Sequence, residues 1–473
     1  MSQGLATLST WTCHRVTHFI ILTKCNQCVL HINSYIACMQ RIRKIYSEYP
    51  RNFWIVIATL FIDRVGGALI FPFIGLFITA KFQIGMTEIG QLFTIVAIAG
   101  IFGSMVGGAM TDKFGRKVVI IFGLVTSALS ALILGFTEDM NIIYFTGGII
   151  GLFGNIGGPA QQAMIADLLP REKQADGFGI LRIAFNLAVT IGPAIGGVLA
   201  TYSYIWLFII DAIASTITAI IVFFIIPETK PEVAPDKSGE SILETLGGYF
   251  KVGRDVLFMA FMFASILMTL AYIQMNTTLS VFLRDVHGIP DQGYGYLLSL
   301  NAGMVVLFQF WITRRIKHLP SMMVMVLGTL LYAIGFSMYG FVSTYILFMM
   351  AMVIITIGEM LVAPVGQALV ANFAPQDMRG RYMAMFGFSW TIPFALGPLA
   401  AGLIMDNYNP NWIWYGSGIV SMMAIAAYLF LHFRASERLA KMNITVQPEN
   451  ETNIYREVEN NSLARASHAS DKT

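Results

Sequence analysis

The sequence predicts an all-α membrane protein whose twelve transmembrane helices form two pseudo-symmetric six-helix bundles. Three observations predict this fold: a charge-poor composition, twelve apolar runs long enough to cross a bilayer, and a repeat between the two halves. Of the 473 residues, 56% are hydrophobic and 12% are charged, whereas soluble domains carry about 25% charged residues. The net charge of +3 is spread over short loops, so nothing indicates a nucleic-acid partner.

The apolar runs are read as helices because of their length. A transmembrane helix needs about 20 mostly apolar residues, whereas a spanning strand would need only about 10 residues of alternating polarity. The twelve predicted spans are 53–79, 88–111, 117–136, 141–166, 178–200, 204–226, 256–283, 292–313, 321–341, 344–370, 381–405 and 411–433.

A long polar break divides the membrane portion after its sixth span. It separates an N-terminal six-helix bundle (39–226) from a C-terminal one (255–433), with a cytoplasmic linker (227–254) between them and a cytoplasmic polar tail (434–473) at the end. Within the linker, Ile242 to Phe250 could lie on the membrane surface.

Residues 1–38 form an N-terminal extension, and the sequence leaves open whether it is translated in the native protein. It contains all four cysteines of the chain: Cys13, Cys25, Cys28 and Cys38. The spacing of Cys25, Cys28 and His31 could suggest a metal knuckle, but no second ligand pair has matching spacing, so no metal site is predicted. A translation start at Met39 is the alternative, because a basic lead-in follows it.

The charges of the loops predict the orientation of the chain. The turns after spans 2, 4, 8 and 10 carry most loop cations: Lys113, Arg116, Lys117, Arg171, Lys173, Arg314, Arg315, Lys317, Arg379 and Arg381. The opposite turns carry little beyond Lys81 and Arg284. Cations beside spans stay on the cytoplasmic side. We therefore expect a multi-pass protein of the cell membrane with both termini in the cytoplasm.

The second half of the chain repeats the first. Gly158–Pro170 corresponds to Ala363–Pro375, and Gly192–Gly197 corresponds to Gly397–Gly402, both at an offset of 205 positions without a gap. Such a match is hard to obtain from composition alone. Two parallel repeats related by an axis along the membrane normal are one arrangement expected of transporters.

A charged turn joins the second and third spans. It runs Gly108-Ala-Met-Thr-Asp112-Lys113-Phe-Gly115-Arg116-Lys117. Asp112 could cap free amides at a helix start, and Gly108 would let another helix come close. The stretch resembles the loop between helices two and three of the major facilitator superfamily, G-x-L-[A/S]-D-R-x-G-R-K, with mild departures at Met110, Thr111 and Lys113.

This resemblance covers about residues 39–433 and implies two bundles that rock about a central site, which opens alternately to each face. It also implies that Gly108–Lys117 and a degenerate partner near Thr313–Lys317 latch the cytoplasmic side.

A second motif lies in the fifth span. Gly192-Pro193-Ala-Ile-Gly196-Gly197 removes side-chain bulk and one backbone donor, which favours a close helix contact and a local bend. The pattern resembles the antiporter motif of drug-efflux members of the superfamily, with Ala188 at its usual first glycine. Because related importers can keep a degenerate form, the motif supports export without establishing it.

Charged residues inside predicted spans are candidates for proton coupling, since a charge at mid-bilayer costs ~3 kcal/mol or more and normally faces a cavity or a partner. They are Asp63, Arg64, Arg182 and Glu359; Asp211 is a further charged residue, in the sixth span, to which no role is assigned. Neighbours on a helix point about 100° apart, so Asp63 and Arg64 should not pair directly; one of them could face the central cavity. A structural ion network between helices is the alternative.

Glu359 is the strongest candidate for proton handling. It precedes Pro364 in an otherwise apolar span, and this arrangement resembles the tenth span of some drug–proton antiporters. A neutral carboxyl hydrogen-bonded within the bundle is the alternative. The fourth span lacks the arginine of the antiporters' R-x-x-x-G pattern, where Gly147 stands instead; Arg182 or Arg64 would have to substitute.

Candidates for the wall of a substrate cavity are the polar and aromatic residues of spans 7, 8 and 11: Tyr272, Gln274, Asn276, Asn301 and Trp390. Apolar and aromatic walls with a few polar groups suit amphipathic organic molecules. The alternative is that the aromatic residues pack against lipid.

We therefore predict a secondary transporter, most simply one that exports small amphipathic organic compounds in exchange for protons. A metabolite or sugar importer of the same superfamily is the alternative. A polytopic enzyme or receptor is disfavoured because no His, Asp or Cys cluster lies outside residues 1–38, and no G-x-x-x-x-G-K-[S/T] stretch occurs. The expected partners are substrate, protons and lipid, with no cofactor, and we expect a monomer.

Overall fold

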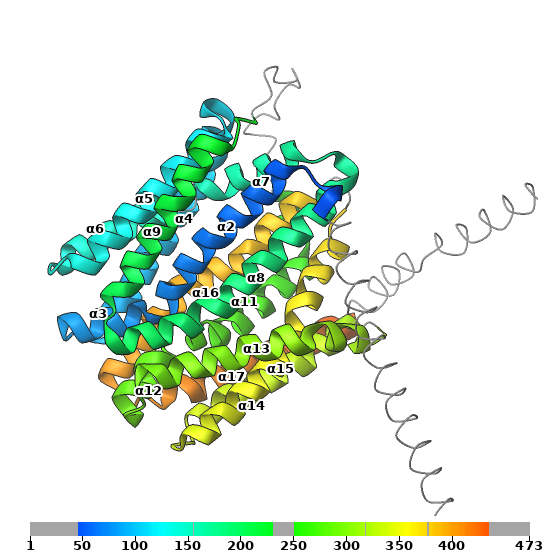
Figure 1. The fold of residues 1–473 in the computed structure, drawn as a ribbon. Coiled ribbons are helices and arrows are strands. Elements are labelled where there is room, and N and C mark those ends of the chain that lie inside the picture. The colour runs from blue at the N-terminus through cyan, green and yellow to red at the C-terminus, as the bar shows by residue number, and fades with distance from the viewer. Residues whose placement is uncertain (1–45, 155, 230–249, 317, 376–377, 435–473) are drawn as a thin grey trace, which may run out of the picture.

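The computed structural model describes residues 46–154, 156–229, 250–316, 318–375 and 378–434 (Figure 1). Over these ranges the chain is helical without strands, and twelve helices are long and apolar enough to cross a membrane. The all-α prediction is therefore confirmed. The predictions for residues 1–38, the surface segment after Ile242 up to Tyr249, and the polar tail after Arg434 lie outside the described residues.

The first six spans are built from eight α-helices and a short 3-10 helix. They are α2 (Arg51–Ile70), η1 (Phe71–Phe73), α3 (Ile74–Phe82), α4 (Met86–Phe114), α5 (Arg116–Phe136), α6 (Met140–Gly154), α7 (Gly157–Leu168), α8 (Arg171–Tyr202) and α9 (Ile205–Ile225). Pro72 lies at the start of η1. Because proline lacks a backbone donor and crowds the preceding turn, the first span changes there from α-helix to the tighter 3-10 helix η1 and then continues as α3.

The last six spans follow the same scheme. They are formed by α11 (Val256–Thr277) with the short α12 (Leu279–His287), α13 (Asp291–Ile316), α14 (Ser321–Tyr339), α15 (Tyr345–Phe373), α16 (Arg379–Asn407) and α17 (Trp412–Arg434). The predicted span 256–283 is broken at Thr278, where the backbone departs from regular helix geometry, with φ −116° and ψ −33°. The Thr278 hydroxyl donates to Gln274 Oε1 at 2.7 Å, and such local bonds compete with a regular helix.

The helices pack as two bundles with a pair of equivalent contacts between them (Figure 1). In the first bundle α2 packs on α8 and α9, and α4 packs on α6; in the second, α14 packs on α15 and α17. The bundles meet where α4 contacts α16 and where α8 contacts α13. The first contact joins spans 2 and 11 and the second joins spans 8 and 5, so the two contacts exchange under the predicted pseudo-twofold relation.

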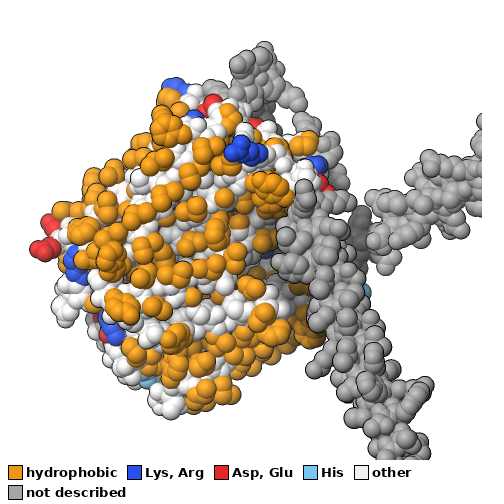
Figure 2. All heavy atoms as spheres, viewed as in Figure 1, with side chains coloured by type: hydrophobic (Ala, Val, Ile, Leu, Met, Phe, Trp, Pro, Cys, Tyr) orange, Lys and Arg blue, Asp and Glu red, His pale blue; other side chains and the backbone are white. Residues whose placement is uncertain are grey.

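The lateral surface of the molecule is apolar. Figure 2 shows hydrophobic side chains over most of one face, while the visible charged side chains gather near its two ends. Large residues such as Phe145, Phe224 and Leu307 are 71%, 77% and 72% exposed. An apolar surface of this extent suits contact with lipid tails rather than water.

Candidate functional site

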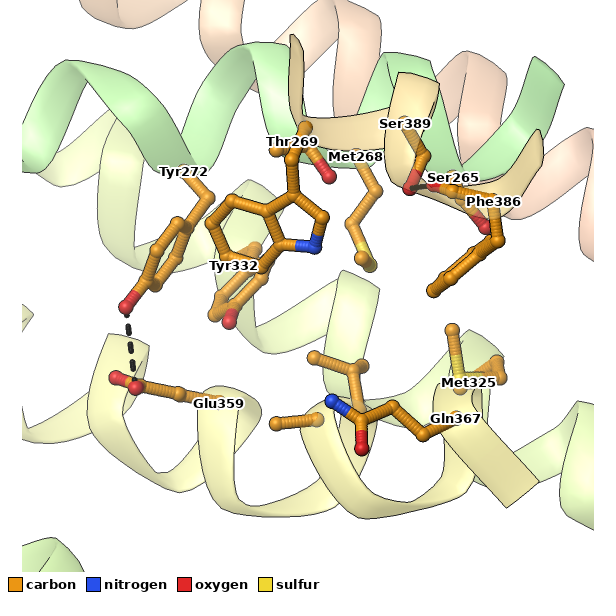
Figure 3. A pocket seen from close by; sticks show the side chains of 14 residues that line it. Ser265, Met268, Thr269, Tyr272, Met325, Tyr332, Glu359, Gln367, Phe386 and Ser389 are labelled. Atoms are coloured by element: carbon orange, nitrogen blue, oxygen red, sulfur yellow. Dashed lines mark hydrogen bonds between the residues drawn. The ribbon is translucent and has the colours of Figure 1, made fainter. Parts of the chain in front are cut away.

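A cavity of about 90 Å³ lies between α11, α14, α15 and α16 (Figure 3). Its walls carry aromatic, apolar and a few polar side chains: Ser265, Met268, Thr269, Tyr272, Met325, Tyr332, Glu359, Val362, Ala363, Gly366, Gln367, Phe386, Ser389 and Trp390. Pockets for drug-sized ligands measure roughly 300–1,000 Å³. The described conformation is therefore too contracted for such a molecule, which would require the walls to separate.

Glu359 is the acidic residue of this wall, and two neutral donors hold its carboxyl group. The Tyr272 hydroxyl of α11 donates to Oε1 at 3.0 Å, and the Asn301 amide of α13 donates to Oε2 at 2.8 Å. The same amide contacts the Thr356 hydroxyl at 3.0 Å. Across the described residues, Glu359 has no cationic partner. A carboxyl without a counter-ion inside a membrane bundle is free to take a proton or a positively charged ligand.

Aromatic rings enclose the side of the cavity next to Glu359. The Tyr272 ring lies 5.6 Å from that of Tyr332 and 5.7 Å from that of Trp390, the latter in an edge-to-face arrangement. Trp390 is also half exposed. Ring faces attract organic cations and pack against apolar groups, so the wall can accommodate a molecule with both properties.

Arg182 of α8, in the first bundle, contacts a residue that lines this cavity. Its Nη1 donates to Oε1 of Gln367 at 2.9 Å, and Gln367 lines the cavity. Arg182 thus contacts the neighbourhood of the site through an amide, not through Glu359.

Three of the five predicted wall residues are not among the lining residues of this cavity. Gln274 is occupied within its own helix segment, where it donates to the Leu270 carbonyl at 3.2 Å and accepts from Thr278. Two positions along a helix turn a side chain by about 200°, which points Gln274 away from the face of Tyr272. Asn276 lies one turn beyond Tyr272, past the cavity. Asn301 acts on Glu359 rather than on the cavity itself.

Asp63 and Arg64 point in different directions, as their adjacency on α2 predicts. Asp63 accepts a hydrogen bond from the Ser215 hydroxyl at 2.8 Å. The Arg64 guanidinium lies 5.3 Å from the centre of the Phe185 ring. The structure places neither residue on the wall of the cavity described above.

The charged turn after the second span differs from its prediction in one respect. Asp112 lies inside the last turn of α4, which runs on to Phe114, and not at a helix start. Glu228 caps the start of α5 instead, accepting the backbone N–H of Arg116 at 2.9 Å and of Lys117 at 3.1 Å. Gly115 separates the helices at φ 94°, and a Cβ there would lie 2.4 Å from Glu228. The conformation requires glycine, and a side chain there would in addition displace the capping carboxylate of Glu228.

In the described conformation, Arg116 and Lys117 of this turn bind partners within the first bundle. Arg116 Nε forms an ion pair with Asp167 at 3.0 Å, and Lys117 Nζ donates to the Phe223 carbonyl at 2.6 Å. The stretch at Thr313–Ile316 also has contacts within its own bundle, such as Arg314 over the Phe310 ring. Lys317 and the side chain of Asp112 lie outside what the structure describes, so the proposed cytoplasmic latch stays a prediction.

The glycines of the fifth-span motif lie at close helix contacts. A Cβ on Gly192 would lie 2.5 Å from Ala68 Cβ, and one on Gly196 would lie 2.8 Å from the Leu69 carbonyl oxygen. Gly197 faces the other bundle, where its Cβ would lie 2.8 Å from Gly295 Cα. Pro193 lies inside α8. The motif therefore packs α8 against α2 on one side and against α13 on the other.

Polar bonds also join the bundles at the end remote from the charged turn, and sequence reasoning missed them. Asp406, at the end of α16, accepts the backbone N–H groups of Met86 at 2.9 Å and Thr87 at 2.7 Å, at the start of α4. A Cβ on Gly85 would lie 2.5 Å from the same carboxylate. The Asp406 carboxylate thus caps a helix of the opposite bundle.

Two further links lie at this end. Arg284 of α12 donates to the Leu76 carbonyl at 3.1 Å and to the Thr79 hydroxyl at 2.9 Å, both in α3. The Tyr204 hydroxyl donates to Asp291 of α13, and burial together with this hydrogen bond raises the pKa of Tyr204. We name the three links made by Asp406, Arg284 and Tyr204 the distal clasp. The distal clasp holds the remote ends of the two bundles together in this conformation.

Known proteins resemble this chain over most of its length. A "Na(+), Li(+), K(+)/H(+) antiporter" of Planococcus maritimus is 26% identical over 379 residues, 74% of this chain and 87% of the relative. The uncharacterised transporter YttB of Bacillus subtilis (strain 168) is 28% identical over 385 residues, 80% of this chain and 95% of YttB. The multidrug resistance protein MdtH of Shigella flexneri is 22% identical over 391 residues, 81% of this chain and 91% of MdtH.

Solved structures share the fold. The nucleoside transporter NupG aligns with a TM-score of 0.67 at 15% identity, covering 81% of this chain and 99% of NupG. A peptide transporter POT aligns with a TM-score of 0.65 at 15% identity, covering 83% of this chain and 96% of POT. The Major Facilitator Superfamily model matches residues 56–362 and 292–449. With twelve helices in two bundles, the chain is a multi-pass membrane transporter, not an enzyme, and belongs to the Major Facilitator Superfamily.

Proposed function

We propose that this protein exports small amphipathic organic compounds, positively charged ones above all, in exchange for protons. One observation carries the proposal: Glu359, which has no counter-ion among the residues that the structure describes, lies on an aromatic cavity wall and is held by the neutral donors Tyr272 and Asn301. The carboxyl can hold either a proton or the positive group of a substrate, and the two compete for the same oxygens. This competition is the chemical requirement of an exchanger.

Alternating access would convert this competition into transport. With the distal clasp closed, the cavity would be reached from the end that bears the charged turn, where a substrate displaces the proton of Glu359. Opening of the distal clasp would expose the loaded cavity to the other side, where a proton displaces the substrate. Exchange of one proton for one monovalent cation moves no net charge, so the pH gradient drives it, and one pH unit, about 1.4 kcal/mol, supports a substrate gradient of about tenfold.

The membrane orientation belongs to the same proposal. Loop cations place the end with Arg116 and Lys117 in the cytoplasm of the cell, together with both termini. On this orientation the distal clasp faces the exterior, and the described conformation is closed to the outside. We propose a monomer as the working unit, because each chain contains a complete cavity between its own helices.

Exchange of alkali-metal ions for protons is a second candidate. It is favoured by the Planococcus relative, whose name states that activity, while the name of MdtH favours drug export. The aromatic rings around Glu359 support the organic substrate, since Na⁺ and K⁺ prefer several oxygen ligands and gain less from a mostly apolar wall. The likeness to nucleoside and peptide transporters shows the fold alone.

Proteoliposomes that contain the purified protein and a trapped pH-sensitive dye test the proposal. After an inside-acidic gradient is imposed, external ethidium or tetraphenylphosphonium should release protons from the vesicles. Glu359→Gln should abolish this release because the amide cannot exchange a proton. Glu138→Gln, at an exposed carboxyl between α5 and α6, is the matched control and should keep full activity.

Each other result points away from the proposal. Proton release by NaCl, KCl or LiCl but not by the organic cations would establish the alkali-metal exchanger. Uptake of radiolabelled sugar or nucleoside without proton release would establish a facilitator. Full activity of Glu359→Gln would remove the carboxyl from the mechanism.

A further inference from the structure

Two carboxyl groups, one on α2 and one on α9, lie close enough to interact electrostatically outside the cavity that contains Glu359. Asp211 of α9 is only 5% exposed. A Cβ on Gly66 of α2 would lie 2.5 Å from Asp211 Oδ1 and 3.1 Å from Asp211 Cα, so the Asp211 carboxyl rests directly on the surface of α2. Residues three apart share a helix face, and Asp63 lies three positions before Gly66. Asp211 and Asp63 accordingly interact electrostatically.

Gly66 provides the space into which the carboxyl fits. A Cβ at this position would displace the Asp211 carboxyl oxygen and would also lie tightly against Asp211 Cα at 3.1 Å and Ala214 Cβ at 3.2 Å, so α9 would have to give by a few tenths of an ångström. The surface of α2 therefore forms a cradle for Asp211, with Asp63 at its edge. The Asp211 carboxyl can lie against α2 because residue 66 is glycine.

The hydrogen bonding of this pair is incomplete. Asp63 accepts one bond, from the Ser215 hydroxyl at 2.8 Å, and this occupies Oδ1. Across the described residues Asp211 accepts no hydrogen bond from any donor, although almost all of its surface is covered. A carboxylate with so little exposed surface and no donor among the described residues is costly, so a proton shared with Asp63 would lower that cost.

No cation among the described residues pairs with either carboxyl or donates a hydrogen bond to Asp211. Arg64, next to Asp63 on α2, interacts with it electrostatically, but its guanidinium lies over the Phe185 ring and forms no ion pair with either carboxyl among the described residues. On α8, which packs against α2, the Arg182 side chain is bonded to Gln367. Lys173, also on α8, donates to the Glu48 carbonyl.

The remaining neighbours, α5 and α7, carry their charged side chains near one end of the bundle. Arg116 in the first turn of α5 is paired with Asp167 in the last turn of α7, and Lys117 is bonded to the Phe223 carbonyl. Phe223 lies twelve positions after Asp211 on α9, which at 1.5 Å per residue places these groups about 18 Å away along the helix.

We propose that Asp63 and Asp211 bind one exchangeable proton between them, which forms a second proton site in the first bundle, separate from Glu359. Two ionised carboxylates in contact inside a membrane bundle repel each other and lack solvation. A single proton removes one charge and gives Asp211 a hydrogen bond that no side chain of the described residues provides, with Asp63 as the partner. Ser215 occupies Oδ1 of Asp63, which leaves Oδ2 to take part in binding the proton. Coupling of this proton to transport rests on the proposed function; its binding does not.

Infrared spectroscopy of the purified protein detects this proton directly. During a titration in H₂O and D₂O, the C=O stretch of a protonated carboxyl appears separately from that of carboxylates and amides. Besides the band of Glu359, we expect one titrating band that is lost in Asp211→Asn and equally lost in Asp63→Asn, with no further loss in the double variant. Glu359→Gln should leave this band in place and remove a different one. Ser215→Ala should shift the band without removing it.

The outcomes distinguish a shared proton from independent carboxyls and from a bound metal ion. A spectrum that Asp211→Asn leaves unchanged would overturn the proposal, provided the variant elutes as a single species with an unchanged circular dichroism spectrum. Bands lost additively from two single variants would show two independent carboxyls and would also overturn it. Displacement of the band by NaCl, but not by choline chloride, would reassign the site to an alkali-metal ion. None of these results bears on the Glu359 band, so the two proposals fail separately.

Discussion

Asp406 offers the sharpest test of how the two bundles separate. Its carboxylate accepts two backbone N–H groups at 2.9 and 2.7 Å at the start of α4, and α4 has no side-chain cap of its own there. Asp406→Asn keeps the size of the side chain but leaves one oxygen to accept. The change removes the negative charge from the positive end of the helix dipole and at least one of the two bonds.

The magnitude follows from the surroundings of Asp406. A hydrogen bond to a charged group contributes about 1.5–3 kcal/mol when it is buried, and a charge at a helix start adds about 0.3–1 kcal/mol. Asp406 is exposed, so water replaces part of what is lost, and a discounted figure of about 1 kcal/mol is appropriate. Because the bond joins the bundles, this energy shifts the ratio of distally open to distally closed molecules about fivefold.

Electron–electron double resonance measures that ratio. Spin labels at Tyr202 and Phe341 lie at the distal end of opposite bundles, and both positions are exposed. The four native cysteines all precede Met39 and can be replaced without touching any span. In lipid nanodiscs the population with the longer distance should rise about fivefold relative to the shorter one.

A matched variant separates this effect from a general loss of helix capping. Asp139→Asn removes a carboxylate that accepts the N–H of Asn141 at 2.8 Å near the start of α6, but within a single bundle. It should leave the distance distribution unchanged. An unchanged distribution in Asp406→Asn, or equal shifts in both variants, would refute the idea that the distal clasp sets the balance between conformations.

Two further predictions use the same end of the molecule. Gly90→Ala should open it further than Asp406→Asn, because a Cβ on Gly90 would lie 2.4 Å from the backbone Cα of Leu399; the same spin-label distances report it, and Gly67→Ala, with nothing within 4 Å, should behave as wild type. His287 lies beyond the α11 span, with its ring 5.0 Å from Phe282 and 4.9 Å from Phe348, and burial lowers its pKa. The unfolded state therefore takes up a proton below pH about 6.5 that the folded state resists, so thermal stability in detergent should be complete above that pH and fall below it. His287→Phe should weaken this acid dependence, and an identical dependence in the variant would show that other groups cause it.

The sequence predicted the spans well because their signal is local. A run of about 20 apolar residues has few alternatives to a spanning helix, and the polar loops between runs mark the ends. The break at Thr278 and the distal clasp were not predictable in the same way. Asp406 and Met86 are separated by 320 positions, and nothing in either segment identifies the other as its partner.

The site was predictable in part, because a charged residue inside the apolar bilayer stands out in the sequence. Glu359 could be found because a carboxylate among apolar residues is costly, and Tyr272 and Trp390 share the cavity with it. The small polar stripe of α11, Ser265, Thr269 and Tyr272 at helical spacing, faces the cavity. Gln274 lies off this stripe, so the helical period excludes it from the cavity face, a signal that the choice of wall residues by polarity alone did not use.

The internal repeat could not have predicted the position of the cavity carboxyl, because it matches structural residues and not titratable ones. At the offset of 205 positions, Pro159 matches Pro364 and Gly192 matches Gly397, and these residues shape helices and their contacts. Glu359, by the same offset, falls opposite Gly154, which has no side chain to titrate. The two bundles therefore share a scaffold but not a site. If the carboxyl pair binds a proton as proposed, the two bundles would take up protons in different surroundings and so over different pH ranges, whereas two identical halves would respond alike.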